Sequence, residues 1–335
     1  MTESLRICLL ALIVMLATTP VQADGGLDTS REDVAGFIRM METDHGMPAA
    51  ETREILASAE IQPPILEAME RPAEKVKPWY EYRQIFLTDQ RIAEGVEFWR
   101  NHRDLLDDIS SQTGVPPEII VGILGVETFY GRITGRYRVI DALSTLAFEY
   151  PPRSRFFTGE LEQFLLLVRE QGIDPLTATG SYAGAMGGPQ FISSSYRAYA
   201  VDTSGDGRVD LWSDWADIMG SVANYFTAHD WQRGGKIATR IDGQIPENLL
   251  SDGLALDRTG SQLAPYGVDA EDHEKLMVFS LESEDGPEFW VGYNNFFVIT
   301  RYNRNNMYAM AVHDLGRSVR DRIDAGDSAG PAAGK

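Results

Sequence analysis

Glu127 is a carboxylate on the otherwise apolar face of a predicted helix. The helix is expected to begin at residues 116–118, where two prolines and an acid favour a first turn, and to end at Gly131. Its apolar face carries Ile120, Ile123 and Leu124, spaced from Glu127 as one helical stripe. Partial desolvation and the negative end of the helix dipole would both raise the pKa of Glu127, as a general acid requires. A buried glutamate that only satisfies a backbone group or an arginine would fit the same position.

A glycine-rich segment at residues 180–191 has the composition of a ligand-binding loop. Its small residues allow a ligand to approach the backbone closely, and Gln190 adds an amide that can bond to hydroxyl or acetamido groups. A tight packing turn is the alternative explanation. Acid–base cleavage of a glycoside needs a proton donor together with polar and aromatic residues that hold sugars, and the segments around Glu127 supply both types.

Oxygen-bearing side chains alternate along residues 202–214 as they do in the loop of an EF hand. The sixth position is Gly207, which the sharp turn of such a loop requires. The twelfth is Ser213 instead of a bidentate glutamate, so Asp210, Asp214 or Asp217 would have to close the site. An Asp-Gly turn without metal is the alternative, and a calcium sensor is disfavoured because only one such loop is found. The candidate ligand positions are Asp202, Ser204, Asp206, Arg208, Asp210, Asp214 and Asp217.

The first residues have the pattern of a secretory signal. An apolar run from Ile7 to about Ala17 follows Arg6, and residues 21–23 resemble a cleavage site, so the mature protein is expected to begin near Asp24. The run is shorter than the roughly 20 residues of a spanning helix, which disfavours an uncleaved anchor and stable membrane insertion. The single cysteine lies in this run without the small-residue box of a lipid-modified cysteine. Export to the periplasm without lipidation is therefore predicted.

Composition is that of a soluble protein with a sizeable core. The chain has 335 residues, 43% hydrophobic and 24% charged, and a net charge of −20. This acidity opposes binding to nucleic acid or anionic lipid through long-range attraction. No P-loop, nucleophile elbow or dinucleotide fingerprint occurs, and the 5 histidines lack metal-ligand spacing. No organic cofactor is predicted.

The elements expected around these residues are mostly helical, so the predicted fold class is α+β, predominantly α. One amphipathic stretch, from Ile92 through Val96 and Trp99 to Leu105, is expected to be a single core helix. Apolar–polar alternations at 236–241 and 276–281 predict short strands. The predicted divisions are a signal (1–23), an N-terminal helical region (24–105), a catalytic core (106–232), a small β subdomain (233–292), a segment returning to the core (293–322) and a disordered tail (323–335).

Several segments resemble the lytic murein transglycosylase B family, which is glycoside hydrolase family 103. The similarity extends from about Val34 to Leu315, nearly the whole mature chain. It implies a lysozyme-like helical core, an N-terminal helical domain and a small β domain inserted before the last core helix. The similar segments are 122–131, 141–151, 180–187, 190–191, 220–226, 296–303 and 308–312.

The resemblance also implies a reaction. The glutamic acid matching Glu127 protonates the glycosidic oxygen between N-acetylmuramic acid and N-acetylglucosamine. As a carboxylate it then takes the proton of the muramoyl C6 hydroxyl, which closes a 1,6-anhydro ring. Such an enzyme is a carbon–oxygen lyase acting on polysaccharides. Internal attack removes the need for a second carboxylate, although a developing oxocarbenium ion still needs polar support.

Residue matching implies a substrate site around Glu127, with Tyr302 or Tyr308 aiding the cation or the ring. Arg153 matches one of two adjacent arginines thought to contact peptide or glycan. The partner position here is Pro152, and residues 188–189 replace a bulkier spacing in some members, so the outer subsites are expected to differ. The implied substrate-binding residues are Ser181, Gln190, Tyr302, Asn303, Tyr308 and Arg153.

The resemblance implies further that the loop at 202–214 binds calcium in a structural role beside the cleft. The expected partners are peptidoglycan glycan strands, without nucleic acid, and the protein is expected to be a monomer that could meet enzymes of cell-wall synthesis. Two other functions stay open. One is a hydrolytic muramidase that uses Glu127 with water, and the other is a non-catalytic peptidoglycan-binding or scaffolding protein.

Overall fold

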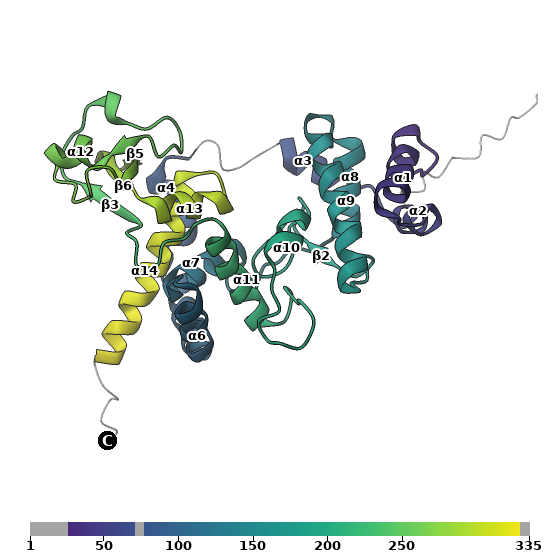
Figure 1. Ribbon diagram of the computed structural model, residues 1–335, viewed down its shortest axis with the longest axis horizontal. Coiled ribbons are helices and arrows are strands. Elements are labelled where there is room, and N and C mark those ends of the chain that lie inside the picture. Colours follow the sequence, from purple (N-terminus) through teal and green to yellow (C-terminus); the bar gives the residue numbers. More distant parts are fainter. Residues whose placement is uncertain (1–25, 71–76, 329–335) are drawn as a thin grey trace, which may run out of the picture.

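The computed structural model describes residues 26–70 and 77–328. In these ranges helices predominate, with one four-stranded and one two-stranded antiparallel sheet, which confirms the predicted α+β, predominantly α class. The predicted signal at 1–23 lies outside the described residues. No helix in the described part is both long and apolar enough to cross a membrane. The molecule is elongated, with α1 (Glu32–His45) and α2 (Ala49–Ala57) at one end and the larger sheet at the other (Figure 1).

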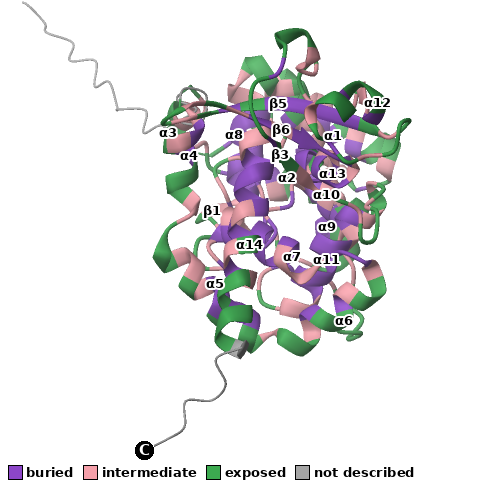
Figure 2. Ribbon diagram, turned by 90° about the vertical axis from the view of Figure 1, so that its left-hand side faces the viewer, coloured by how far each residue is buried: buried purple, intermediate pink, exposed green. Residues whose placement is uncertain are grey.

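In the half of the molecule that carries the larger sheet, the helices α7 (Pro117–Thr128) and α14 (Asn306–Ser328) pack against each other (Figures 1 and 2). Glycines bring their backbones together. A Cβ added at Gly122 of α7 would lie 2.4 Å from a backbone oxygen of α14, and one at Gly316 of α14 would lie 2.1 Å from a backbone oxygen of α7. Any larger residue at either position would push the helices apart. The neighbouring core helices are α4 (Trp79–Phe86), α5 (Asp89–Asn101), α6 (Arg103–Thr113), α11 (Trp215–Ala228) and α13 (Asn294–Tyr302).

A second packed pair, α8 (Val139–Glu149) and α9 (Ser154–Gln171), lies beside this core (Figure 1). The predicted N-terminal region at 24–105 does not form one packing unit. Its helix α3 (Pro63–Glu70) packs on α8, α4 packs on α14, and α5 packs on α7 and α14. The apolar faces of these helices are thus buried against different partners. The small elements of this part are β1 (Tyr137–Arg138), β2 (Thr179–Gly180), a 3-10 turn (Pro151–Arg153) and α10 (Ser193–Tyr199).

The four-stranded sheet lies within the predicted β subdomain, in the order β3-β6-β5-β4. Strand β5 is buried on both faces. Leu276 and Val278 join a small separate core, whereas Met277 and Phe279 face the main core, so the apolar run predicted as a strand connects the two. The strands are β3 (Ala238–Ile241), β4 (Arg258–Thr259), β5 (Lys275–Ser283) and β6 (Gly286–Gly292), with α12 (Gly260–Leu263) and 3-10 turns at Glu247–Leu249 and Ala264–Tyr266.

Two predicted boundaries are wrong. The core helix expected through Leu105 breaks at His102, whose φ of −121° and ψ of 20° separate α5 from α6. The ring of His102 packs against Phe98 and Trp215, with centroids 4.6 and 5.5 Å apart, and desolvation lowers its pKa. The tail expected to be disordered from residue 323 instead continues α14 to Ser328, because Ile323 is still buried in the core. Residues 329–335 lie outside the described part.

Candidate active site

Glu127 lies in the last turn of α7. Residues 119–125 are buried around the whole helix, so the predicted apolar stripe does not mark out one face. Glu127 and its neighbour Val126 are half-buried, and Glu127 lines a cavity at the C-terminal end of the helix. Glu127 is therefore accessible to solvent because it lies in the last turn of the helix, and not because one face of the helix is exposed.

The helix ends at Thr128, three residues before the glycine that was predicted to end it. Phe129 and Tyr130 take the left-handed backbone with φ of 51° and 57°, which residues with a side chain adopt rarely and at a cost of about 1–3 kcal/mol. The Thr128 hydroxyl donates to the Gly188 carbonyl at 3.1 Å and accepts from the Gly131 N–H at 3.0 Å. These bonds offset the strain and tie the end of α7 to the glycine-rich loop.

Tyr308 on α14 forms a direct hydrogen bond with Glu127. Its hydroxyl donates to Glu127 Oε1 at 2.5 Å, and the side chain is buried. Burial, followed by the charge of Glu127, raises the pKa of Tyr308 well above its ordinary value, so this hydroxyl remains a donor at neutral pH. A donated hydrogen bond favours the carboxylate form of Glu127 and opposes the effects of burial and of the helix dipole. The raised pKa of Glu127 stays a prediction.

A cavity of about 490 Å³ opens at Glu127. Its volume is within the range of small-molecule sites. Of the described residues that line it, Glu127 alone carries a carboxylate. The lining joins α7, the glycine-rich loop and the C-terminal end of α13, which are far apart in the sequence. The predicted substrate-binding residues found in this lining are Ser181, Gln190, Tyr302 and Asn303.

Two polar side chains of the glycine-rich loop, those of Ser181 and Gln190, line the cavity. Ser181 Oγ accepts the N–H groups of Ala183 and Ala185 at 3.3 and 3.1 Å, which leaves the hydroxyl proton available to a ligand. Gln190 has a φ of 52°, and its amide nitrogen donates to the carbonyls of Gly187 and Thr134. The amide group can therefore only accept from a ligand, through Oε1.

An aromatic wall faces this loop. The Tyr302 hydroxyl donates to the Pro189 carbonyl at 2.7 Å, and its ring lies 4.8 Å from that of Tyr225. The Tyr225 hydroxyl donates to the Arg301 carbonyl at 2.7 Å, and burial raises the pKa of Tyr225 to about 12. Burial and the charge of Glu127 also raise the pKa of Tyr302. Both tyrosines are therefore neutral, and their rings can face a sugar.

Sequence reasoning did not select several residues of this lining. Tyr225 was part of a matched motif, but Phe191, Tyr199 and Tyr302, whose rings pack on it, come from other elements, so spacing along α11 could not place it in the cavity. Arg301, near the end of α13, was likewise part of a matched motif without being predicted as a site residue. The lining residues that were not predicted include Tyr182, Ser195, Tyr225 and Arg301.

Arg153 does not lie in this cavity with the other predicted residues. It ends the 3-10 turn before α9, and its guanidinium carbon lies 4.5 Å from the ring centroid of Phe156 and 5.1 Å from that of Phe157. These cation–π contacts hold the Arg153 side chain against the first turn of α9. Tyr308, by contrast, is near the cavity but beneath its lining, where it contacts Glu127.

The loop at 202–214 is curled around its first carboxylate. Asp202 accepts from the N–H groups of Gly205, Asp206 and Gly207 at 2.7, 3.2 and 2.8 Å. These bonds, above all the one from Gly207, hold the pKa of Asp202 below its ordinary value. Ser204 Oγ also donates to Asp202, at 3.4 Å. The loop therefore has the turn that the glycine at the sixth position predicts.

Asp217 closes this loop onto α11. It is almost fully buried, and its oxygens accept from the N–H groups of Thr203, Ser204 and Asp210 at 2.8, 3.1 and 2.9 Å. Asp214 instead caps the N-terminus of α11. Within the loop, the N–H of Arg208 donates to Asp206, and Asp210 accepts from the N–H groups of Trp212 and Ser213 and from the Ser213 hydroxyl.

The oxygen donors of the loop fit calcium by type, because hard cations prefer carboxylate and carbonyl oxygens. Their carboxylates are turned to backbone N–H groups, and no three Asp, Glu or His side chains among the described residues converge as a metal site.

Comparison with known proteins gives one family. The model of the transglycosylase SLT domain matches residues 29–317. Membrane-bound lytic murein transglycosylase B of Escherichia coli (strain K12) is 43% identical over 308 residues, which cover 88% of this chain and 84% of that protein.

Solved structures agree. The catenated lytic transglycosylase SltB1 of Pseudomonas aeruginosa superposes with a TM-score of 0.83 at 46% identity, covering 88% of this chain and 98% of that one. Escherichia coli Slt35 in complex with bulgecin A has a TM-score of 0.82 at 43% identity, covering 89% and 96%. Another structure of Slt35 is in complex with calcium. With a family match over most of its length, and with the predicted acid at the end of α7, this chain belongs to the lytic transglycosylase family defined by the SLT domain.

Proposed function

We propose that this chain is a lytic murein transglycosylase, which cleaves peptidoglycan between N-acetylmuramic acid and N-acetylglucosamine. The observation that carries the proposal is the single carboxylate, Glu127, among the described residues of the cavity lining. An inverting glycosidase positions its water with a second carboxylate about 6.5–9.5 Å from the acid, and a retaining one uses a second carboxylate as the nucleophile about 5–5.5 Å away. A lone acid supports attack by a group of the substrate itself.

In this reaction Glu127 acts first as the acid and then as the base. The Glu127 carboxyl gives its proton to the glycosidic oxygen as the bond from C1 breaks, and N-acetylglucosamine leaves with a free hydroxyl. The muramoyl C6 oxygen then bonds to C1, and its proton passes to the Glu127 carboxylate. The products are a 1,6-anhydromuramoyl end and a shortened strand, and Glu127 is again protonated.

The other lining groups would hold the substrate for this attack. Gln190 Oε1 can accept from a sugar hydroxyl or acetamido N–H, and the Ser181 hydroxyl can donate to a carbonyl or ring substituent. The rings of Tyr302 and Tyr225 offer flat surfaces for sugar faces. Tyr308 acts through Glu127, since its hydroxyl bonds to the carboxylate and not to the cavity.

Glu127→Gln tests the role of this acid. The amide keeps the size of the side chain but cannot give or take the proton, so lysis of purified sacculi should fall by at least about 10²-fold, within the range that general acid–base catalysis contributes. Glu97→Gln is the matched control, because Glu97 is exposed on α5 and far in sequence from the cavity lining. Equal lysis by Glu127→Gln and the control would remove Glu127 from the mechanism.

The same experiment addresses the non-catalytic alternative. A scaffolding protein would bind sacculi without releasing soluble fragments, so neither the wild type nor the control would lyse them. Binding of Glu127→Gln to sacculi in a pelleting assay should match that of the wild type if the residue acts only in chemistry.

We also propose that calcium binds the loop at 202–214 in a structural role. The EF-hand-like spacing of its oxygen-bearing side chains supports the proposal, and one structure of Slt35 is in complex with calcium. Calcium should then raise the melting temperature of chelator-treated protein, and Asp202→Asn should reduce that rise. Asp252→Asn is the control, since Asp252 is exposed in the β subdomain. An unchanged melting curve on calcium addition would contradict the proposal.

Finally, we propose a periplasmic, monomeric protein exported by residues 1–23. The proposal rests on the signal pattern and on an expected substrate that lies outside the cytoplasm. N-terminal sequencing of the protein from a periplasmic extract should give Asp24 as the first residue. An intact Met1 would contradict it. Association with enzymes of wall synthesis is an expectation that co-purification would test.

A further inference from the structure

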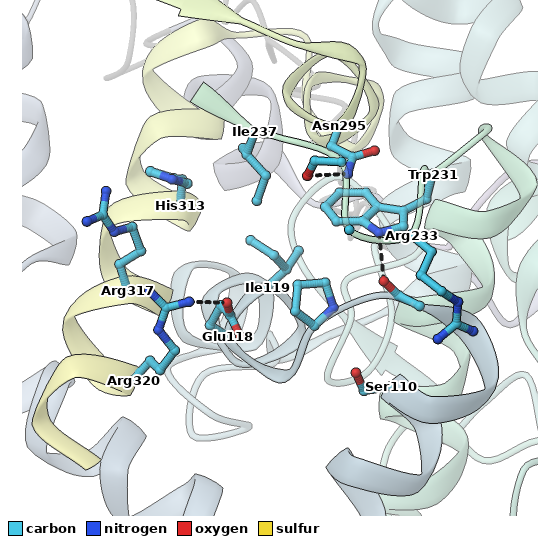
Figure 3. Close-up of a pocket in the computed structure, with 14 residues that line it drawn as sticks. Ser110, Glu118, Ile119, Trp231, Arg233, Ile237, Asn295, His313, Arg317 and Arg320 are labelled. Carbon is cyan, nitrogen blue, oxygen red and sulfur yellow. Dashed lines mark hydrogen bonds and ion pairs between the residues drawn. The ribbon is translucent and has the colours of Figure 1, made fainter. Parts of the chain in front are cut away.

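The two ends of α7 are held by different contacts. At its first turn, the Glu118 carboxylate forms an ion pair with Arg320 of α14 at 2.6 Å, beside a cavity that Ile119 and Trp231 line (Figure 3). This ion pair lies nine residues before Glu127, which at about 1.5 Å per residue is roughly 14 Å along the helix. Contacts at the last turn therefore bear more directly on the position of the Glu127 carboxylate.

One face of α5 receives the turn that follows α7. Arg91, Gly95 and Phe98 are spaced along α5 as one helical stripe. The ring of Tyr130 stacks on that of Phe98 with centroids 5.5 Å apart, and a Cβ added at Gly95 would lie 2.4 Å from the Tyr130 hydroxyl. The guanidinium carbon of Arg91 lies 4.6 Å from the ring centroid of Phe129. The two residues of this turn that have a left-handed backbone are thus both in contact with α5.

Aromatic rings surround the guanidinium of Arg91. Besides the Phe129 ring, it lies 5.2 Å from the ring centroid of Phe86, at the end of α4. Its Nε and Nη1 atoms are buried and have no hydrogen-bond partner among the described residues. The face of an aromatic ring carries negative charge that attracts a cation, so the two rings replace the missing hydrogen-bond acceptors.

The position of Arg91 in its own helix does not favour a cation. Arg91 is the third residue of α5, where the positive end of the helix dipole opposes positive charge. A second cation, Arg132, lies 4.9 Å from the Phe129 ring centroid and forms an ion pair with Glu94 of α5. The favourable contacts of Arg91 are therefore those with the rings, and the Phe129 ring connects α5 to the backbone two residues after Glu127.

We propose that Arg91 is a positioning residue for glycan cleavage, which fixes the Phe129 ring and, through it, the place of the Glu127 carboxylate. The left-handed backbone of Phe129 is strained, so the turn needs contacts that prevent its relaxation. Arg91 does not line the cavity at Glu127, so it acts through Phe129 and not on the substrate. The inference rests on the proposed role of Glu127, and its tests separate the two.

Amide hydrogen exchange tests whether Arg91 holds the turn, and it does not depend on activity. The N–H groups of Tyr130 and Ile133 close the turn with hydrogen bonds of 3.0 and 2.9 Å to carbonyls of α7. In Arg91→Met, which keeps an unbranched apolar side chain, both amides should exchange roughly tenfold faster relative to those of residues 120–123 in the middle of α7, which corresponds to about 1.4 kcal/mol.

Arg320→Gln is the matched control for this exchange experiment. It breaks the ion pair at the other end of α7 and should leave the ratio between the turn amides and the mid-helix amides unchanged. If the ratio in Arg91→Met equals that of the wild type, or if Arg320→Gln changes it as much, Arg91 does not hold the turn and the proposal is wrong.

Steady-state kinetics on soluble peptidoglycan strands test the link to Glu127. The kcat of Arg91→Met should fall by at least about tenfold because a displaced catalytic group is costly, whereas KM should stay close to that of the wild type because the cavity lining is intact. Arg320→Gln should keep both constants. A wild-type kcat in Arg91→Met beside an inactive Glu127→Gln overturns this inference alone. If Glu127→Gln keeps wild-type lysis, the proposed acid is wrong and the inference fails with it.

A double-mutant cycle assigns the effect to the contact between Arg91 and Phe129. Phe129→Leu keeps an apolar side chain but removes the ring, so the double variant with Arg91→Met should lose no more of kcat than the more affected single variant. Losses that multiply in the double variant would show that the two side chains act independently, which contradicts the proposal. Thermal melting of each variant verifies that it is folded.

Discussion

Tyr308→Phe removes a single hydroxyl, the one that donates to Glu127 Oε1 at 2.5 Å, and keeps the buried ring in place. A hydrogen bond to a charged group contributes about 1.5–3 kcal/mol, and one pH unit corresponds to about 1.36 kcal/mol. The bond favours the carboxylate, so its loss favours the protonated acid. Because Glu127 is half-buried and water can replace the hydroxyl in part, we expect a shift of about one pH unit, at the lower end of that range.

The assay is the initial rate of sacculus lysis as a function of pH at low substrate concentration, which reports kcat/KM. The alkaline limb, where the free enzyme loses its acid, should move to higher pH in Tyr308→Phe. Tyr225→Phe is the matched control, because its hydroxyl in the same cavity donates to the Arg301 carbonyl and not to Glu127. The reasoning is refuted if the limb of Tyr308→Phe coincides with that of the wild type, or if Tyr225→Phe moves it equally.

Two further substitutions test how α7 is held. Gly122→Ala should lower the free energy of unfolding by about 1–3 kcal/mol in urea titrations, because its Cβ would meet the α14 backbone, whereas Gly159→Ala, with open space around it, should not destabilise. If both substitutions changed the free energy of unfolding equally, the close approach of α7 and α14 at Gly122 would not contribute to stability. Thr128→Val should cost about 1–3 kcal/mol, since the Gly131 N–H loses its acceptor and the Gly188 carbonyl loses a donor. Unchanged stability would contradict this.

The position of Glu127 on α7 could be predicted from local sequence signals, whereas the other predicted lining residues were implied by the family resemblance. The prolines fixed the start of α7, and the acid in its apolar pattern marked Glu127 before any contact was known. The end of the same helix could not be predicted. The left-handed backbone at Phe129 and Tyr130 depends on a hydrogen bond from Thr128 to Gly188, which is distant in sequence.

Long-range packing also explains the other differences. The break at His102 depends on the ring of Trp215, and the burial of Ile323 extends α14 beyond the point where composition suggested disorder. Arg153 matched a family position; its guanidinium lies over the rings of Phe156 and Phe157, close in sequence, and its contact with peptide or glycan stays a prediction. The similarity predicts Tyr308 as a substrate-binding residue, but it does not show which group a side-chain hydroxyl contacts, and here the hydroxyl bonds to Glu127.

The most direct test of the account is mass spectrometry of the fragments that the wild-type protein releases from purified sacculi. If Glu127 acts as acid and then as base on the muramoyl C6 hydroxyl, the new muramoyl ends carry the 1,6-anhydro ring, about 18 Da lighter than hydrolysed ends by the loss of one water. Fragments with reducing muramoyl ends would show that water is the nucleophile, and the account of the single carboxylate would then be wrong.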